Sequence, residues 1–445
     1  MKSADVDVCG PAPFATSRGA GSSGTPVVVF SLALGGARPK DTPSSAFAVA
    51  LEAQATLENA LSFLTRAVVV VHINAATPIS RVLQQKMRNP PSSNVQVLMN
   101  PTRLSVEKHT PAVLAAHLSN WRVCEEHTTC ARRVRDGRFV LLPTNMVFFR
   151  RGVEEWIRRY HYSATVAEAW SGVVPSLHAA EEIERSSFVW HTSHYERSSS
   201  HARLNASSEY AEIWRSFMRS TPPAGWRSSP LVVTGHEGTW YPFSLMRQFV
   251  RAYTGSVFER VANAQQAGAA CPCFCTLYNN TPCALRGGGW SKAPSKVNCV
   301  GGCTFEELLL PTYASQASPT SSEPSTRRAS RAYNSPPVVL SIAAVLRSTA
   351  TGASTDKEGR IIPRLMALAQ RIAARADADA SAGAAAGVAG LSTGPFRHVF
   401  AFKVLHHSFL HTHQALCPNE SRAFLGNSFA MYNQVPLSEK RSLFA

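Results

Sequence analysis

Short apolar runs alternate with stretches of helical spacing along the first third of the chain. Residues 67–74 (AVVVVHIN) are rich in β-branched side chains, which predicts a strand buried on both faces of a parallel sheet. Residues 94–100 and 138–142 repeat that pattern and predict further strands. Helical spacing predicts helices at residues 51–63, 110–124 and 152–160. This alternation indicates an α/β fold with a mixed, mostly parallel central sheet and helices on both faces.

Polar side chains follow these predicted strands at their carboxyl ends. His72 and Asn74 end the first run, Asn100 ends the second, and Thr144 and Asn145 follow the third. Ligands of open α/β sheets bind outside the carboxyl ends of the strands. We therefore expect these five residues to lie near a ligand-binding cleft.

Composition divides the chain into a structured core and less regular segments. Gly, Ser, Pro and Ala dominate residues 1–48, which are expected to form a flexible N-terminal tail. Residues 49–314 are expected to form the main core and 315–337, rich in Ser, Pro and Arg, a linker. The remainder, 338–445, is expected to complete the core around an Ala/Gly-rich insert at 377–394.

The later parts of the core carry weaker patterns. Residues 231–243 predict a strand that opens into a polar and aromatic loop, and a helix follows through Tyr253. Residues 338–347 and 361–376 are compatible with a strand and a helix. The run 396–405 (FRHVFAFKVL) predicts a closing strand.

The chain is basic, with 45 Lys and Arg against 29 Asp and Glu, a formal net charge of +16. Most of the positive charge is arginine, whose planar fork binds phosphate and carboxylate groups. A nucleic acid or a small anion such as a nucleotide diphosphate would suit this charge. The arginines are scattered and no nucleic-acid-binding motif accompanies them, which favours surface charge with a few arginines at a site. A hydrophobic content of 44% excludes wholesale disorder.

Cysteines are concentrated in one part of the chain. Six of the ten lie close together: Cys271, Cys273, Cys275, Cys283, Cys299 and Cys303. In an oxidising compartment they would form disulfides, and in a reducing one they could bind zinc. No Cys-x-x-Cys pair is present, so disulfides are favoured. No apolar run is long enough to span a bilayer, and none has the features of a signal peptide. The chain is thus either soluble or anchored by a segment outside this sequence.

Two adjacent carboxylates, Glu306 and Glu307, open an apolar run behind cysteines and glycines. A carboxylate at the edge of an apolar element can have its pKa tuned for general-base catalysis. The same acids would also be favourable in the first turn of a helix, because they complement the helix dipole. The pattern alone leaves both interpretations open.

Several of these segments occur in the same order in one known family. Residues 71–74 (VHIN) are similar to a strand that ends in His-x-Asp. The similarity continues through 94–95 (NV), 103–106 (RLSV), 115–120 (AAHLSN) and 141–146 (LLPTNM). Residues 236–250 are similar to a Gly-Ser-x-Trp loop followed by Arg-x-Phe-Val. Two amides, Asn74 and Asn145, stand where that family has Asp.

The carboxyl-terminal segments extend the similarity. Glu306, Glu307 and Thr312 match an Asp-Glu pair followed by apolar residues and a Thr, and 400–403 (FAFK) matches a closing strand with a basic residue. In islands over residues 57–407, the chain resembles the core-2/I-branching glycosyltransferases. That group is related to the peptide xylosyltransferases and to uncharacterised plant and protist proteins.

The resemblance implies a GT-A-like nucleotide-sugar transferase fold and an inverting glycosyltransferase of hexosaminyl- or pentosyltransferase type. It implies Glu307 as general base beside Glu306, and no metal, because fixed cations offset the leaving diphosphate. Expected nucleotide-sugar contacts are His72, Asn74, Arg103, Asn145, Arg397 and Lys403. Expected acceptor contacts are Glu237, Trp240 and Tyr241.

The resemblance also implies surroundings for such an enzyme. The donor nucleotide sugar is a substrate, no cofactor is expected, and a glycan or glycoprotein is the expected acceptor. The implied location is the Golgi or secretory lumen, with a soluble cytoplasmic protein as the alternative. A non-catalytic carbohydrate- or partner-binding protein on the same scaffold is a second interpretation. A zinc-cluster, Arg-rich RNA-binding protein is a third.

Overall fold

The structure is a computed structural model. The residues it describes are 26–34, 43–74, 81–102, 104, 111–127, 137–159, 237–266, 309–310, 313–314, 338–341, 369–370, 372–374, 399–404 and 409–416. No helix in these ranges is both long enough and apolar enough to cross a membrane.

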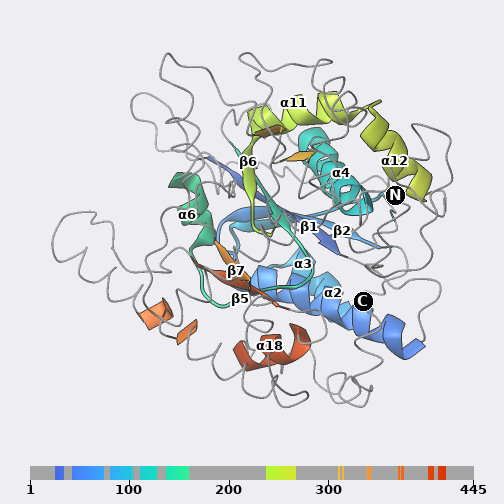
Figure 1. Ribbon diagram of the computed structural model, residues 1–445. Coiled ribbons are helices and arrows are strands. Elements are labelled where there is room, and N and C mark those ends of the chain that lie inside the picture. The colour runs from blue at the N-terminus through green and yellow to red at the C-terminus, as the bar shows by residue number, and fades with distance from the viewer. Residues whose placement is uncertain are drawn as a thin grey trace, which may run out of the picture.

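The central sheet has five strands in the order β3-β2-β1-β4-β6. Figure 1 labels β1, β2 and β6 of this sheet. They are β1 (Val28–Leu34), β2 (Ala67–Ile73), β3 (Val95–Met99), β4 (Arg138–Leu142) and β6 (Trp240–Pro242). The first four are parallel, and β6 is antiparallel to β4. The strand order reverses between β1 and β4, and such a switch point is where open α/β sheets place their ligand site. The predicted α/β fold with a mostly parallel central sheet is confirmed.

Strand β1 corrects the predicted N-terminal tail. Its seven residues are all buried, and they pair with β2 on one side and β4 on the other. The helix that follows, α2 (Pro43–Phe63), also begins inside the range 1–48. The apolar run here is flanked by Gly, Ser and Pro, so an average over the whole range hides a strand. Part of the predicted tail is therefore the middle of the sheet.

Helices cover both faces of the central sheet, as predicted (Figure 1). Helices α4 (Pro111–His127), α11 (Phe243–Tyr253) and α12 (Val257–Gln266) share one apolar cluster with alternate strand residues such as Val29 and Val70. Helices α2 and α6 (Val153–Arg159) share a second cluster with the intervening residues, such as Phe30 and Val69. Because β1, β2 and β4 bury apolar residues on both faces, this part of the sheet lies between two cores.

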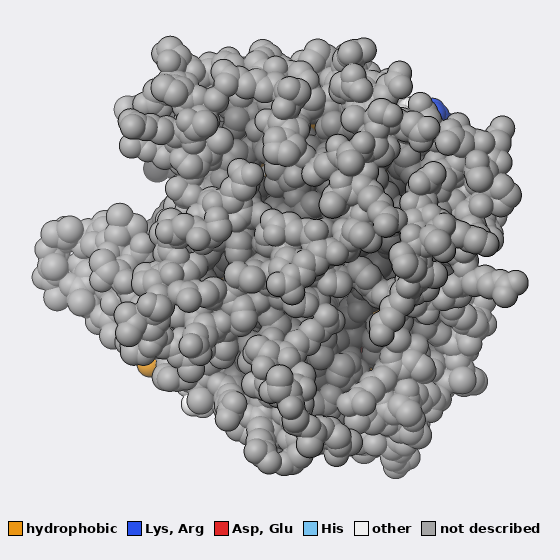
Figure 2. All heavy atoms as spheres, in the orientation of Figure 1, with side chains coloured by type: hydrophobic (Ala, Val, Ile, Leu, Met, Phe, Trp, Pro, Cys, Tyr) orange, Lys and Arg blue, Asp and Glu red, His pale blue; other side chains and the backbone are white. Residues whose placement is uncertain are grey.

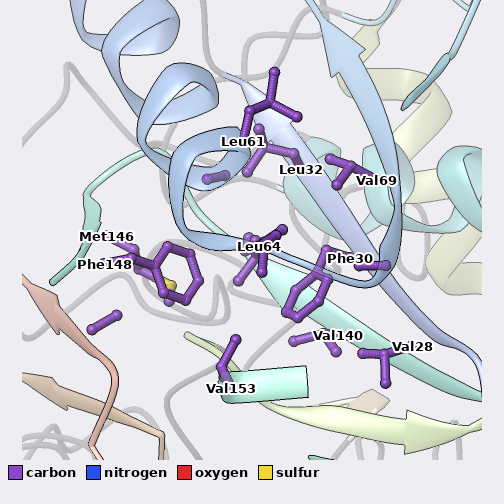
Figure 3. Packing of buried hydrophobic residues seen from close by; sticks show 14 of the residues in the cluster. Val28, Phe30, Leu32, Leu61, Leu64, Val69, Val140, Met146, Phe148 and Val153 are labelled. Atoms are coloured by element: carbon purple, nitrogen blue, oxygen red, sulfur yellow. The ribbon is translucent and has the colours of Figure 1, made fainter. Parts of the chain in front are cut away.

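Figure 3 shows the second cluster, in which Leu61 of α2 lies beside Leu32 of β1. Met146 and Phe148 extend this cluster away from the sheet and belong to β5 (Met146–Phe148). The Asn59 side chain fixes β5 to α2: its Nδ2 donates to Phe148 O at 3.0 Å, and Phe148 N donates to its Oδ1 at 2.7 Å.

A smaller sheet joins distant parts of the chain in the order β5-β8-β7. Its other strands are β7 (Val339–Ser341) and β8 (Ala401–Lys403), with β8 antiparallel to β5 and parallel to β7. The predicted closing strand is thus confirmed, but it belongs to this sheet and not to the central one. Two further helices complete the described elements: α3 (Arg81–Arg88) and α18 (Phe409–Leu416).

Candidate functional site

The carboxyl ends of β1 to β4 meet at one edge of the central sheet, because these four strands are parallel. His72 lies at the end of β2 and Asn74 just after it, Asn100 follows β3, and Asn145 follows β4. Strand direction thus places these four residues at one edge of the sheet, and the ligand-binding cleft expected there stays a prediction. All four are buried. Figure 2 shows few described side chains on the face that it draws.

Asn100 joins two strands and a helix at this edge. Its backbone N donates to Val71 O at 2.9 Å, and its side-chain Nδ2 donates to Asn120 Oδ1 of α4 at 2.8 Å. Its Oδ1 accepts the Thr102 N–H at 2.9 Å. Asn120 Nδ2 in turn lies 3.1 Å from Val70 O of β2 and 3.2 Å from Leu32 O of β1. These bonds satisfy buried polar groups and hold the edge rigid.

Sequence reasoning missed the part that Asn120 plays in holding this edge together. The available signal was that Asn120 is polar, whereas Leu118 and Trp121 near it on the same helix are large apolar residues that are buried in the core. Ser31 of β1 is a second such residue: its Oγ accepts from Asn120 Nδ2 at 2.9 Å and lies 2.8 Å from His117 Nδ1. Both signals become meaningful only once the helix is seen to lie against these strands.

His72 is a buried, neutral residue. It has no exposed surface, and its Nε2 accepts the Leu104 N–H at 3.2 Å. Burial lowers the pKa of the imidazole to about 4, so the ring carries no charge at neutral pH. An uncharged ring does not supply the positive charge that a diphosphate favours. Its contact instead fixes the chain that follows β3.

The lowered pKa of His72 predicts a loss of stability in acid. Above pH 6.5, the ordinary histidine pKa, both the folded and the unfolded protein hold a neutral ring, so this stability is fully present. As the pH falls from 6.5 toward 4, His72 binds a proton in the unfolded state but not in the folded state, so the free energy of unfolding declines. The full effect is at most about 3 kcal/mol. Urea denaturation between pH 8 and 4 should therefore show a shallower decline in the free energy of unfolding for His72→Gln than for wild type. Parallel curves for the two proteins would contradict the assignment.

Lys403 and Glu237 form an ion pair next to the end of β4. Lys403 Nζ contacts Glu237 Oε1, and their side chains are only 16% and 7% exposed. Asn145 ties β8 to the same place: its Nδ2 donates to Val404 O at 2.8 Å, and its backbone O accepts the Val404 N–H at 3.0 Å. Three predicted site residues from distant parts of the sequence thus come together here.

A tight turn presents Glu237 to this site. Gly238 has a φ of +70°, a left-handed conformation that favours glycine. A Cβ at this position would lie 2.5 Å from Val339 Cγ2 of β7. The turn is fixed to β4 by two backbone bonds, Gly238 N to Leu141 O at 2.8 Å and Leu141 N to Thr239 O at 2.9 Å. Glu237 is therefore held on rigid backbone.

Trp240 and Tyr241 do not occupy a sugar-binding position. Both lie in β6 with no exposed surface, Trp240 in the cluster on one face of the sheet and Tyr241 in the cluster on the other. The prediction that they stack on an acceptor sugar is wrong, because a fully covered ring has no face to offer a ligand. Their rings instead pack in the two apolar cores.

The remaining predicted residues lie outside the described part of the chain. They are Glu306, Glu307, Arg103, Arg397 and the six clustered cysteines. Just beyond Glu307, Leu309, Leu310 and Tyr313 are buried with α4 and α11, and the Tyr313 ring meets Phe249 edge-on at 5.3 Å. These three residues, which follow the two carboxylates in sequence, are thus part of the core.

Within the described residues, no three His, Cys, Asp or Glu side chains are grouped as metal ligands. The described cysteine, Cys124, is buried, and burial raises the pKa of its thiol to about 12. A thiol of that kind is neither nucleophile nor metal ligand at neutral pH. Among the described residues, Lys403 and Glu237 are charged groups that lie at this edge of the sheet.

Comparison with models of known families, with curated proteins and with solved structures found no match to the chain. Function is therefore inferred from the residues and from the geometry that they adopt.

Proposed function

We propose that the protein is a glycosyltransferase that moves a sugar from a nucleotide-sugar donor to a hydroxyl acceptor. One observation carries the proposal: Lys403 lies beside the carboxyl end of β4, next to the point where the strand order reverses. The region around such a switch point is where nucleotide-binding α/β proteins place phosphate groups. Lys403 is also the residue that the resemblance assigns to the donor diphosphate.

The fold supports this proposal in its finer form, a GT-A-like nucleotide-sugar transferase. A parallel β3-β2-β1-β4 arrangement with an antiparallel β6 forms one continuous sheet, and a second small sheet delivers Lys403 to its edge. Lys403 would face the diphosphate. Asn145 holds the strand that carries this lysine in place.

The reaction would be a single displacement with inversion at the anomeric carbon. Glu307 would take the proton of the acceptor hydroxyl as its oxygen attacks that carbon. The bond from the carbon to the diphosphate oxygen breaks, and the diphosphate leaves with the electron pair. The resemblance implies an arginine beside the lysine, and Arg397 and Arg364 are the candidates. Lys403 and this arginine would offset the developing negative charge in place of a metal ion.

The proposal is tested by incubating the full chain with UDP-sugars and GDP-sugars, with and without hydroxyl acceptors, in the presence of EDTA. We expect transfer that is unchanged within about twofold by chelation, because fixed cations replace a metal. Release of nucleoside diphosphate and mass spectrometry of the product measure it. Absence of turnover with every donor, together with no UDP or GDP binding by calorimetry, would reject the proposal that the protein is a glycosyltransferase.

The same experiments separate the other two interpretations. Disulfides without nucleotide binding would support a non-catalytic binding protein on this scaffold. That role is favoured by the amides Asn74 and Asn145, which stand at positions where the resembled family has acids. Free thiols with stoichiometric zinc would support the RNA-binding alternative.

A further inference from the structure

Lys403 already has an anionic partner, and that partner is fixed in place. Glu237 Oε1 contacts Lys403 Nζ, and the turn that carries Glu237 is tied by hydrogen bonds to β4 and packed on β7. Lys403 itself lies in β8, the middle strand of the small sheet, opposite Met146 and Ser341. The pair is thus a consequence of two rigid backbones meeting, and not a chance encounter of surface side chains.

The low exposure of this ion pair makes its charges important for the binding of an anionic ligand. At 16% and 7% exposure, the two side chains are screened by water much less than a fully exposed pair. A phosphate that approaches Lys403 meets a lysine whose charge is largely offset, and it also meets the negative charge of Glu237. Binding therefore requires the lysine to exchange one anion for another.

We propose that Glu237 is a resident counter-ion that competes with the donor diphosphate for Lys403. This inference rests on the proposed function and gives the same site a residue that regulates nucleotide binding and product release. When the nucleotide binds, Lys403 turns from the carboxylate to the diphosphate. After sugar transfer, Glu237 reclaims Lys403 and favours release of the nucleoside diphosphate product. The carboxylate thus weakens product binding and keeps the site from being blocked.

The direction in which one substitution changes nucleotide affinity separates the counter-ion role from a role in positioning Lys403. If Glu237 only positioned Lys403, then Glu237→Gln would weaken nucleotide binding. If Glu237 competes for Lys403, the same substitution removes the competitor and the repulsion, and binding tightens. We expect a decrease in the Kd for UDP or GDP of about fivefold, the size typical of a partly exposed ion pair. Gln is nearly isosteric with Glu, and thermal denaturation checks that the variant is folded.

A double-mutant cycle by calorimetry completes the test, with UDP and GDP as probes and the full chain as the protein. Lys403→Met is expected to weaken binding. Adding Glu237→Gln to it is expected to tighten binding less than the same change does in the wild-type chain, because only the direct repulsion of the phosphate is then left to remove. Glu125→Gln is the matched control: it breaks the exposed ion pair with Arg247, 3.1 Å apart, and should leave the Kd unchanged. In turnover assays, Glu237→Gln should show stronger inhibition by the nucleoside diphosphate product.

The outcomes distinguish this inference from the function on which it rests. Nucleotide binding that depends on Lys403 but is weakened or unchanged by Glu237→Gln would overturn the counter-ion role and leave the transferase proposal intact. A Glu237→Gln effect that is as large in the Lys403→Met background as in the wild-type chain would also overturn it, because the carboxylate would then not act through the lysine. Absence of any binding of UDP or GDP to the wild-type chain would reject both.

Discussion

Replacing Trp240 with alanine is expected to lower the free energy of unfolding by about 3–5 kcal/mol. Trp240 has no exposed surface and packs in the cluster formed by α2, α6 and the sheet. It also sits in β6, the strand that pairs with β4 through Val140 and leads into α11. Truncation would remove a large ring from a closely packed core and leave a cavity that rigid strands cannot close.

Urea denaturation followed by circular dichroism measures this effect. Trp240→Phe keeps an aromatic ring and should lose clearly less stability than the alanine variant. Met99→Ala serves as the control, because Met99 is a large apolar side chain that is 42% exposed, and it should change stability little. A Trp240→Ala protein with wild-type stability but a raised KM for the acceptor would instead restore the sugar-stacking role that the resemblance implies.

The parts of the fold that the sequence predicts well are those with local signals. Strands β2, β3 and β4 are apolar runs bounded by polar or turn residues, and α2 and α4 have helical spacing long enough to recognise. Strand β1 has the same apolar character, VVFSLAL, but lies within a Gly- and Ser-rich region. The surrounding composition concealed it, although its place between β2 and β4 makes it the most central strand of the sheet.

The parts that could not be predicted depend on contacts between distant residues. Strand β5 has three residues and exists because Met146 pairs with Lys403 and Asn59 holds Phe148. No local pattern in a three-residue segment specifies a partner more than two hundred residues away. The strand at 396–405 had a local signal, but its pairing with β5 and β7 had none.

The candidate site follows the same division. Polar residues after apolar strands predicted the edge at which Asn100 and Asn145 lie, because strand direction alone brings them together. Their roles were not predictable in this way. Trp240 and Tyr241 proved to be core, and His72 proved to be a neutral buried ring. The pairing of Lys403 with Glu237 arises from tertiary structure, so two residues expected to bind different substrates are in contact.

Glu307→Gln is expected to reduce kcat of sugar transfer by about a thousandfold or more, within the range that general-base catalysis provides. A glutamine keeps the size and hydrogen-bonding shape of the side chain but cannot accept the hydroxyl proton. Glu307 immediately precedes a segment whose Leu309 and Leu310 are buried in the core, so this change of one charge is not expected to disturb the packing that follows. The Kd for the donor nucleotide should remain within about twofold of wild type.

Glu306→Gln is the matched control, because it removes an equal charge from the adjacent position. If Glu307 is the base, the Glu306 variant should retain most of the activity, and only the Glu307 variant should lose the limb of the pH–rate profile that reports a basic group. Equal losses in both variants would indicate that the pair acts only through its charge, as first-turn acids on a helix do. A large loss confined to Glu306→Gln would move the base by one residue. Because donor binding is measured separately, a loss of turnover with the nucleotide still bound places the defect in the chemical step and not in Lys403 or the sheet that carries it.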